Sequence, residues 1–200
     1  FHPSVSPDGK TLYFSSDRPG GYGGMDIYYV NIENDKPFGE VKNLGPDINT
    51  ENDEVFPFCF SKKILFYSSN QNTEKKFNIY IASNKVYNRW EKNILGEPFN
   101  SNEDDTSFSL EKKVRTGFLS SNRNGGKGDD DIYAFKFKPK IKGEKDFYGF
   151  YGRDTLIVGL KNVLDNDIEK MISNDQLIQI VNFKILLIND AKSGELKLNS

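Results

Sequence analysis

The sequence has few of the residues on which many protein sites depend: its 200 residues include one cysteine, one histidine and one tryptophan. A single cysteine, Cys59, excludes an intrachain disulfide and a zinc cluster. Because Cys59 alternates with phenylalanines in "FPFCF", it is predicted to be a buried core thiol. The single histidine, His2, precedes Pro3 and is interpreted as a strand-edge residue rather than a catalytic base. The sequence therefore predicts no cofactor and favours a protein that is not an enzyme.

A large charge of one sign and long apolar runs are also missing. The 27 basic residues nearly balance the 29 acidic ones, which leaves a formal net charge of −2. This balance gives no electrostatic attraction to nucleic acid or anionic lipid. The sequence contains no run of about 18 apolar residues, so no membrane-spanning helix is predicted.

What the sequence does contain is an internal repeat. The stretch "SSDRPGGYGGMDIYYV" (residues 15–30) returns as "SSNRNGGKGDDDIYAF" (residues 120–135), and a fainter copy, "YSSNQNTEKKFNIYIA", lies between them at residues 67–82. Equivalent isoleucines, Ile27, Ile79 and Ile132, are 52 and 53 residues apart. A constant period near fifty residues indicates a repeat architecture.

The segments that connect these copies repeat as well. "LGPDINTENDEVFP" (residues 44–57) matches "LGEPFNSNEDDTSF" (residues 95–108), and each carries a short acidic cluster before the next apolar run. Because the acidic clusters, at residues 51–54 and 103–105, recur between successive units, we expect them to form hydrogen bonds from one unit to the next.

Each unit predicts about four short strands. In the first unit "HPSVS" and "TLYFSS" flank "PDGK", a tight hairpin turn, and the glycine-rich loop leads into the strand "DIYYVNIE". "DKPFG" is expected to turn the chain before a more polar strand, "EVKNLG". Four antiparallel strands every 40–50 residues or so are typical of a β-propeller blade. The predicted fold class is thus mainly β, with a partial β-propeller of about three four-stranded blades near residues 1–45, 46–97 and 98–138.

The glycine-rich loops could be phosphate sites or tight β-connections. The first loop lacks the third glycine of a dinucleotide fingerprint, and no helix is predicted after it. In the last loop, Lys127 is not followed by the Ser or Thr that a P-loop requires. The loops are therefore interpreted as sharp turns that glycine permits. The polar or aromatic residues of these loops and their flanks are the candidates for binding at a loop or rim: Asp17, Arg18, Tyr22, Asn122, Arg123 and Lys127. For the two arginines a structural clamp on neighbouring carbonyls or acids is favoured over a substrate clamp.

A calcium motif is the alternative for the last loop. "GGKGDDDIY" (residues 125–133) fits the calcium-binding nonapeptide, with Asp129, Asp130 and Asp131 as candidate ligands. Calcium takes six to eight oxygen ligands, whereas three consecutive side chains of an extended segment point in alternating directions. No second nine-residue turn follows, so the interpretation as part of the repeat is favoured and no metal is predicted.

The first copy, "HPSVSPDGKTLYFSSDRPGGYGGMDIYYV", resembles the propeller repeats of the TolB-like class, whose signature contains S-P-D-G-K and a following D-I-Y. The variant with S-S-D-R-P-G-G resembles the repeat segment of OmpA-family cell-envelope proteins of Gram-negative bacteria. The resemblance covers residues 1 to about 138. It implies a location in the periplasm or at the outer membrane, and partners among envelope proteins or peptidoglycan-associated components.

After residue 138 the repeat ends. A lysine-rich linker is expected at residues 139–145, and residues 146–200 resemble the start of a bacterial cadherin-like or immunoglobulin-like module, an incomplete β-sandwich. The resemblance is carried by "TLIV" (residues 155–158), "VLDND" (residues 163–167) and "GELKLN" (residues 194–199). Apolar residues at i, i+3 and i+4 predict one short helix near residues 162–172. The chain is interpreted as a fragment, since closed propellers need four or more blades.

The expected function is that of a non-enzymatic cell-envelope scaffold or interaction module whose blades present a protein- or glycan-binding surface. One alternative is the accessory propeller of a hydrolase whose catalytic domain lies elsewhere, although no G-x-S-x-G element occurs here. The other is an adhesin-like binding module, which the C-terminal resemblance suggests.

Overall fold

A computed structural model describes residues 1–84, 89–111, 116–136 and 185–187 of the chain. These residues form a mainly β structure of three antiparallel sheets. The first sheet contains β1 (Ser4–Val5), β2 (Thr11–Ser16), β3 (Asp26–Glu33) and β4 (Lys36–Asn43). The second contains β5 (Glu54–Ser61), β6 (Ile64–Ser69), β7 (Asn78–Asn84) and β8 (Trp90–Ile94), and the third contains β9 (Asp105–Glu111), β10 (Thr116–Ser121), β11 (Asp131–Lys136) and β12 (Ile185–Leu187).

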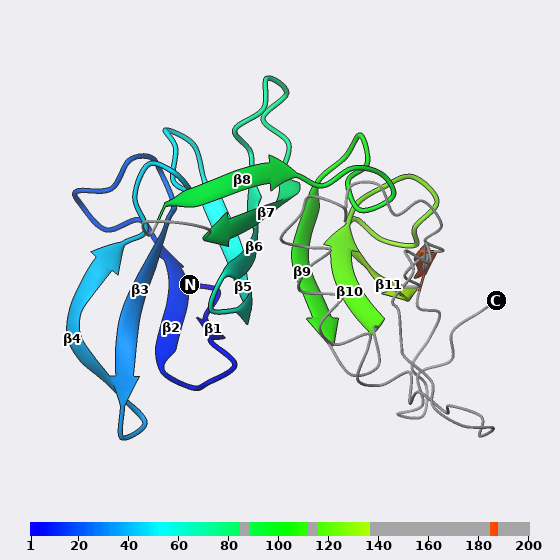
Figure 1. Ribbon diagram of the computed structural model, residues 1–200. Helices are drawn as coiled ribbons and strands as arrows, with labels where there is room; N and C mark the ends of the chain where they lie inside the picture. The colour runs from blue at the N-terminus through cyan, green and yellow to red at the C-terminus, as the bar shows by residue number, and fades with distance from the viewer. Residues whose placement is uncertain (85–88, 112–115, 137–184, 188–200) are drawn as a thin grey trace, which may run out of the picture.

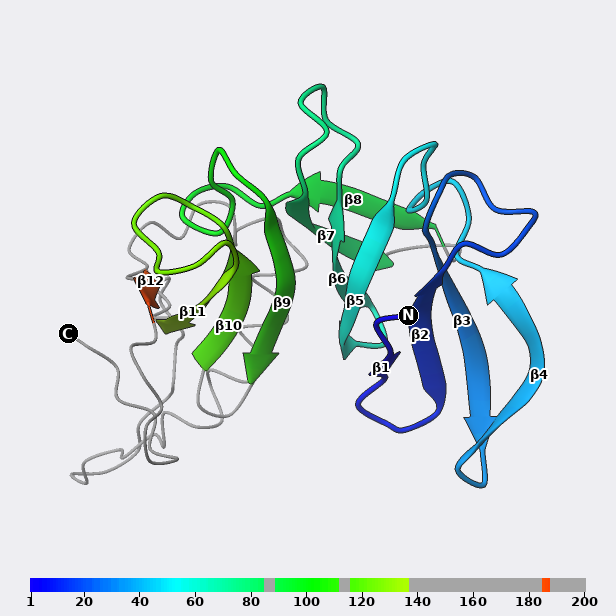
Figure 2. The ribbon, with the colours of Figure 1, turned by 180° about the vertical axis from the view of Figure 1, so that it is seen from behind.

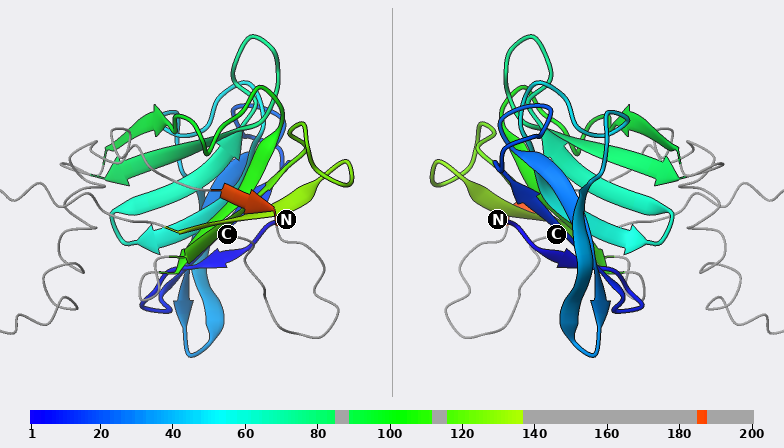
Figure 3. Two further views of the ribbon diagram at one scale, coloured as in Figure 1. Left: turned by 90° about the vertical axis from the view of Figure 1, so that its right-hand side faces the viewer. Right: turned by 90° about the vertical axis from the view of Figure 1, so that its left-hand side faces the viewer.

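The three sheets follow one another in chain order across the molecule (Figure 1). In each sheet the strands pair in sequence order, and the neighbours in the first two sheets are joined by hairpins or short loops. The side views show the sheets overlapping one behind another (Figure 3). The repeat appears in the structure, since β2, β6 and β10, whose ends carry the paired serines of the three copies, occupy the same position in successive sheets. The pairing register repeats with them: Ser16 lies opposite Asp26, Ser69 opposite Asn78, and Ser121 opposite Asp131.

A backbone irregularity repeats as well. His2, Phe56 and Ser107, at the start of the first strand region of each sheet, have positive φ angles of 50°, 52° and 53°. Register shifts accompany this conformation in β5 and β9. Residues other than glycine rarely adopt it because the Cβ atom crowds the carbonyl oxygen. Three unrelated side chains thus share one backbone conformation, which is a property of the repeat unit rather than of any one residue.

The core lies between consecutive sheets. Between the first and second sheets it includes the predicted core thiol Cys59, which is 4% exposed and packs with Tyr13 and Leu65. Between the second and third sheets the core is largely aromatic, and the rings of Phe66 and Phe108 stack with centroids 4.3 Å apart. The buried members of this larger cluster are Phe60, Ile64, Phe66, Ile79, Ile81, Leu95, Phe99, Phe108, Leu110, Leu119, Tyr133 and Phe135.

The hairpin turns are confirmed in one case and corrected in another. The predicted turn over residues 7–10 joins β1 to β2, and Gly9 supplies the positive φ of 72° that it needs. The expected turn "DKPFG" is wrong, because Lys36–Asn43 already forms β4. The chain turns at Asn34 and Asp35, with φ angles of 49° and 59°. Two central residues at positive φ give the twist that a two-residue hairpin requires, and Asn and Asp tolerate it.

The C-terminal predictions lie mostly outside the described residues. The linker at 139–145 and the short helix near 162–172 belong to this part, so both stay predictions. Of the stretch expected to form an Ig-like module, β12 is described, and its backbone pairs antiparallel with β11 in the third sheet. No helix within the described ranges is long and apolar enough to cross a membrane.

Candidate functional site

The connections between strands define two rims of the molecule. The β2–β3, β6–β7 and β10–β11 connections lie along one rim, drawn at the top of Figure 2 and called the upper rim here, and the β1–β2 turn lies at the opposite, lower rim. All the binding candidates that the sequence indicated lie in the β2–β3 and β10–β11 connections, on the upper rim. They fall on the first and third sheets, and no hydrogen bond or ion pair among the described residues joins one group to the other.

The glycine-rich loops close on their own carboxylates. In the first loop the backbone N–H groups of Tyr22 and Gly23 donate to the Asp26 carboxylate at 2.7 and 3.1 Å. A Cβ atom added at Gly21 would lie 2.5 Å from Asp26 Oδ2, so the loop can approach the carboxylate only because glycine stands there. The N–H groups that a phosphate would need are already bonded to Asp26, which agrees with the interpretation of the loop as a turn.

The last loop repeats this arrangement. The N–H groups of Lys127 and Gly128 donate to Asp131 Oδ2 at 2.6 and 3.2 Å. Asp131, one of the three candidate calcium ligands, thus has the same role as Asp26, while Asp129 and Asp130 lie exposed in the loop. No group of three or more His, Cys, Asp or Glu side chains able to hold a metal ion occurs in the described part of the chain.

The repeated connecting segments form two joints between sheets, the first joint (residues 44–54) and the second joint (residues 95–105). In each joint the side-chain amide of one buried asparagine both accepts from and donates to the backbone of one residue in the preceding sheet, as a neighbouring strand would. Asn49 Oδ1 accepts from Ile27 N–H at 2.8 Å, and Asn49 Nδ2 donates to Ile27 C=O at 3.0 Å. Asn100 forms the same two bonds with Ile79, at 2.7 and 2.9 Å.

The acidic residues of the joints repeat their bonds too. The N–H of Met25 donates to Asp53 at 2.8 Å, and the N–H of Phe77 donates to Asp104 at 2.7 Å. Each of these backbones also accepts a bond, since Glu54 N–H donates to Met25 C=O, and its counterpart Asp105 N–H donates to Phe77 C=O. The acidic clusters therefore join one sheet to the next, as their recurrence predicted.

Arg123 is a clamp on the second joint. Its guanidinium donates to the carbonyls of Pro98 and Phe99 at 2.9 and 2.8 Å and to Asp105 Oδ1 at 2.5 Å. It also lies 5.0 Å from the centre of the Tyr133 ring. The side chain of Asp105 is fully buried and that of Arg123 is 16% exposed, so this ion pair is shielded from solvent. The expectation of a structural clamp agrees with these contacts.

Arg18, the equivalent arginine of the first sheet, is placed differently. Its Nε donates to Ser16 Oγ at 3.1 Å, and its guanidinium lies over the rings of Phe14 and Tyr28, 5.1 and 4.8 Å from their centres. Asp17 and Arg18 are both exposed, as is Tyr22 at 51%. These upper-rim side chains are accessible to a partner, and their role in binding stays a prediction.

The first joint balances its buried acid without an arginine. Glu54 is completely buried and accepts hydrogen bonds from the hydroxyls of Thr50 and Ser69, each at 2.7 Å. Burial raises the pKa of Glu54, and the hydrogen bonds from Ser69 and Thr50 oppose part of that change. Lys92 lies near this acid and donates from Nζ to Ile48 C=O at 3.2 Å, while burial lowers the pKa of Lys92. This glutamate is thus held by neutral donors and one half-buried cation.

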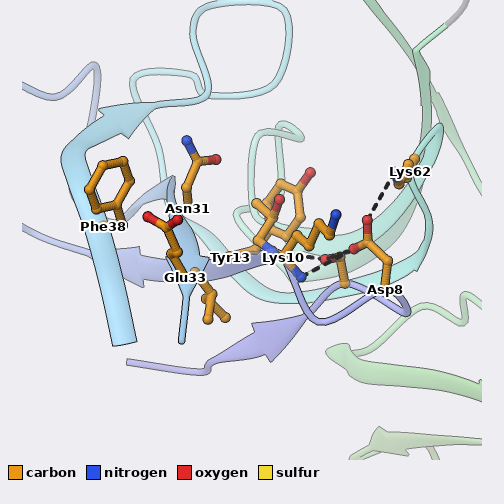
Figure 4. Close-up of a pocket in the computed structure, with 10 residues that line it drawn as sticks. Asp8, Lys10, Tyr13, Asn31, Glu33, Phe38 and Lys62 are labelled. Atoms are coloured by element: carbon orange, nitrogen blue, oxygen red, sulfur yellow. Dashed lines mark hydrogen bonds and ion pairs between the residues drawn. The ribbon is translucent and has the colours of Figure 1, made fainter. Parts of the chain in front are cut away.

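A pocket that sequence reasoning missed opens at the lower rim between the first two sheets (Figure 4). It has a volume of about 620 Å³. Strand pairing assembles one wall, because Thr11 lies opposite Asn31 and Asn31 lies opposite Phe38 across β2, β3 and β4. The remaining lining residues come from the β1–β2 turn, the strand ends and the β5–β6 turn: Ser6, Asp8, Lys10, Tyr13, Ile32, Glu33 and Lys62.

The charges of the pocket are partly paired. Asp8 accepts from Ser6 Oγ at 2.6 Å and forms an ion pair with Lys62 at 2.9 Å, which closes the pocket on the side of the second sheet. The bond from Ser6 and the nearby Lys62 ammonium hold the pKa of Asp8 well below its usual range. Burial raises the pKa of Tyr13 to about 12, so its phenol stays protonated at neutral pH. The pocket therefore offers a neutral phenol beside an exposed ion pair.

A search of protein-family models found no match to the chain, and a search of curated proteins found none either. The function of the chain is therefore inferred from the geometry of its residues.

Proposed function

We propose that the chain is a non-enzymatic interaction module of the bacterial cell envelope, built as part of a β-propeller that presents a protein- or glycan-binding surface. The observation that carries this proposal is the repetition, in both joints, of three side-chain bonds to the backbone of the preceding sheet. Asn49 and Asn100 accept from the N–H groups of Ile27 and Ile79. Asp53 and Asp104 accept from the N–H groups of the residues just before those strands, Met25 and Phe77. Polar residues that could suggest catalysis thus serve to hold the sheets together.

The propeller arrangement is supported by how the sheets cover each other. In each of the first two units, four sequential antiparallel strands match the blade of a propeller, and the third unit supplies three such strands, to which β12 adds a fourth. A single sheet cannot bury both faces, so adjacent blades must stack. Ile27 and Ile79 are fully buried next to the joint that follows each of them, whereas the equivalent Ile132 is 58% exposed. That exposure supports the stacking of a further blade on this side of the third sheet.

The envelope location is supported by the TolB-like pattern of the first unit, "SPDGK" (residues 6–10) followed by "DIY" (residues 26–28). Propellers usually bind partners through the loops at their rims or the mouth of their channel. The chain has an accessible surface at each rim: the glycine-rich loops above and the pocket below. The periplasm or outer membrane would supply envelope proteins and peptidoglycan-associated components as partners.

The proposal is tested by chemical crosslinking and capture of the full-length protein from intact envelopes, with mass spectrometry and sugar analysis of what is recovered. The matched control is Asn100→Ala, which breaks the second joint. This variant should lower the amount of folded protein and, in proportion, the amount of partner recovered. We expect a specific envelope protein or wall glycan with the native protein. Recovery of neither, or turnover of ester or peptide substrates by the purified protein, would overturn the proposal.

A further inference from the structure

The lower-rim pocket is built from residues that the repeat does not explain. The turn Asp8-Gly9-Lys10 has Ser61-Lys62-Lys63 as its counterpart in the second sheet. In the strand pairing, Phe38 lies opposite Asn31, whereas the corresponding pair in the second sheet is Glu91 opposite Ser83. Lys10 recurs there as Lys63, but the positions of Asp8, Asn31 and Phe38 hold other residues, so the frame does not require these three. Their presence in the first sheet needs another reason.

Several bonding groups in the pocket have no partner among the residues that the structure describes. In the described ranges no hydrogen bond or ion pair engages the Lys10 ammonium, the Glu33 carboxylate or the Asn31 amide. Phe38 is 60% exposed on an edge strand beside them. Figure 4 shows Lys10 lying near Tyr13 on one side of the pocket, and Glu33 lying beside Asn31 and Phe38 on the other. The pocket thus combines a free donor, a free acceptor, an amide and an accessible aromatic face.

The composition of the pocket excludes most classes of ligand. The apolar part of the lining comes from Tyr13, Ile32 and Phe38. A purely apolar ligand would leave Lys10, Asn31 and Glu33 without bonding partners, which disfavours it. An anionic polymer such as a nucleic acid needs an excess of positive charge, but two acidic residues, Asp8 and Glu33, balance two lysines, Lys10 and Lys62. A ligand with no net charge, many hydroxyl groups and one apolar C–H face satisfies all these groups together.

From this set of unpaired groups we propose that the lower-rim pocket binds a short neutral saccharide. The inference names the ligand of one surface of the proposed interaction module and so depends on that proposed function. The C–H face of a sugar ring packs on the exposed ring of Phe38. The Glu33 carboxylate accepts from sugar hydroxyls, and the Lys10 ammonium and the Asn31 amide donate to sugar oxygens. Hydrogen bonds to charged groups are the stronger ones, so Glu33 and Lys10 contribute most of the polar binding.

The size of the pocket agrees with this class of ligand. Its volume of about 620 Å³ lies within the range of roughly 300–1,000 Å³ found for small-molecule sites. The Asp8–Lys62 ion pair closes the pocket on the second-sheet side at 2.9 Å. Asn31 and Glu33 lie on β3 and Phe38 lies on β4, and the pairing of these strands fixes the spacing of the three residues before a ligand arrives.

The test is a titration of the full-length protein with candidate ligands, in which binding is measured by amide chemical shifts and by calorimetry. Four probes are used separately: cellobiose and N,N′-diacetylchitobiose as neutral sugars, glycylglycine as a zwitterion and inorganic phosphate as an anion. We expect a neutral sugar to shift the amides of Asn31, Glu33 and Phe38. Phe38→Ala and Glu33→Gln should each weaken binding about tenfold or more, a change of about 1.4 kcal/mol. Val41→Ala, an exposed position on the same strand outside the pocket, should leave it unchanged.

Three results would overturn the inference: no shift with either sugar, shifts confined to the upper rim, or equal affinity of Phe38→Ala and the native protein. Stronger binding of glycylglycine or phosphate would replace the saccharide with a charged ligand and would overturn it as well. The envelope capture experiment, repeated with Phe38→Ala and Glu33→Gln, separates this failure from that of the proposed function. If both variants still capture a partner, the proposed interaction module is retained and the saccharide pocket is rejected.

Discussion

Replacement of Asn100 by alanine should lower the free energy of unfolding strongly, although it removes only one small side chain. Asn100 is 8% exposed and forms three hydrogen bonds to backbone groups. Its Oδ1 accepts from Ile79 N–H at 2.7 Å, and its Nδ2 donates to the carbonyls of Ile79 and Leu95 at 2.9 and 2.7 Å. The Ile79 carbonyl keeps a second partner, the N–H of Leu95 at 3.0 Å, but the N–H of Ile79 would lose the bond that holds it to the joint.

The size of the effect follows from these bonds. A buried N–H group without a partner costs about 1–3 kcal/mol, and each lost bond whose partner is otherwise satisfied costs about 0.5–1.5 kcal/mol. The sum for Asn100→Ala is on the order of 3 kcal/mol, a large part of the roughly 5–15 kcal/mol that stabilises a typical domain. Alanine also removes the contact that sets the second joint against β7, so the second and third sheets should loosen together.

The assay is urea unfolding of the full chain, together with hydrogen exchange of the Ile79 amide. Asn122→Ala is the matched control, because the exposed Asn122 accepts one bond from Asp104 N–H at 2.8 Å and water can replace it. We expect a loss of less than about 1 kcal/mol for the control and faster exchange at Ile79 only in Asn100→Ala. Equal stability of the two variants would refute the assignment of Asn100 to a structural joint.

The other predictions use the same unfolding assay. Arg123→Gln should lower the free energy of unfolding by on the order of 3 kcal/mol, because it leaves a buried acid without its cation. The exposed Arg18→Gln should lower it by under about 1 kcal/mol. Equal decreases in the two variants would contradict the assignment of Arg123 as a clamp. Because burial raises the folded pKa of Glu54 above 4.5, its contribution to stability is complete below that pH and is lost as pH rises through the folded value. Glu54→Gln should remove this fall, and an unchanged pH profile would contradict it. Ser107→Gly should stabilise by about 0.5–1 kcal/mol by relieving a positive φ, whereas Ser109→Gly should destabilise by about as much; the reverse order would refute the strain.

Much of the frame could be predicted because it repeats. The period of 52 to 53 residues located the second strand of each sheet and indicated that the joints connect successive units. The role of Asp26 and Asp131 in closing the loops was not predicted, although their equal position after each glycine-rich stretch was visible. Aspartate at the start of a strand gives no local sign of which N–H groups it will accept.

What does not repeat could not be located in the same way. The Asn34–Asp35 turn was misplaced because "DKPFG" contains Pro and Gly, the usual turn residues, while Asn34 and Asp35 extend a polar run. Lys36–Asn43 nevertheless forms a strand, since Pro37 and Gly39 are tolerated on an edge. Sequence contains no signal of the register that puts Phe38 beside Asn31. The one available hint was that the first unit departs from the second at the β1–β2 turn.

The pocket and the joints divide the polar residues of the chain into two groups. The asparagines and acids that recur in the joints hold one sheet to the next, and Asn31 and Glu33 of the first unit remain open to a ligand. This division explains why the candidates derived from repetition, such as Arg123, turn out to have extensive contacts within the frame. Candidates for binding are better sought where one repeat differs from its neighbours.

The most direct test of the account is the hydrogen-exchange rate of four amides, those of Met25, Ile27, Phe77 and Ile79, in the native chain. Each donates to a side chain of a joint, to Asp53, Asn49, Asp104 and Asn100 respectively. We predict protection equal to that of amides in the centres of β3 and β7, with both joints alike. Exchange at the rate of exposed loops would contradict the account, because the recurring polar residues would then not be holding the sheets together.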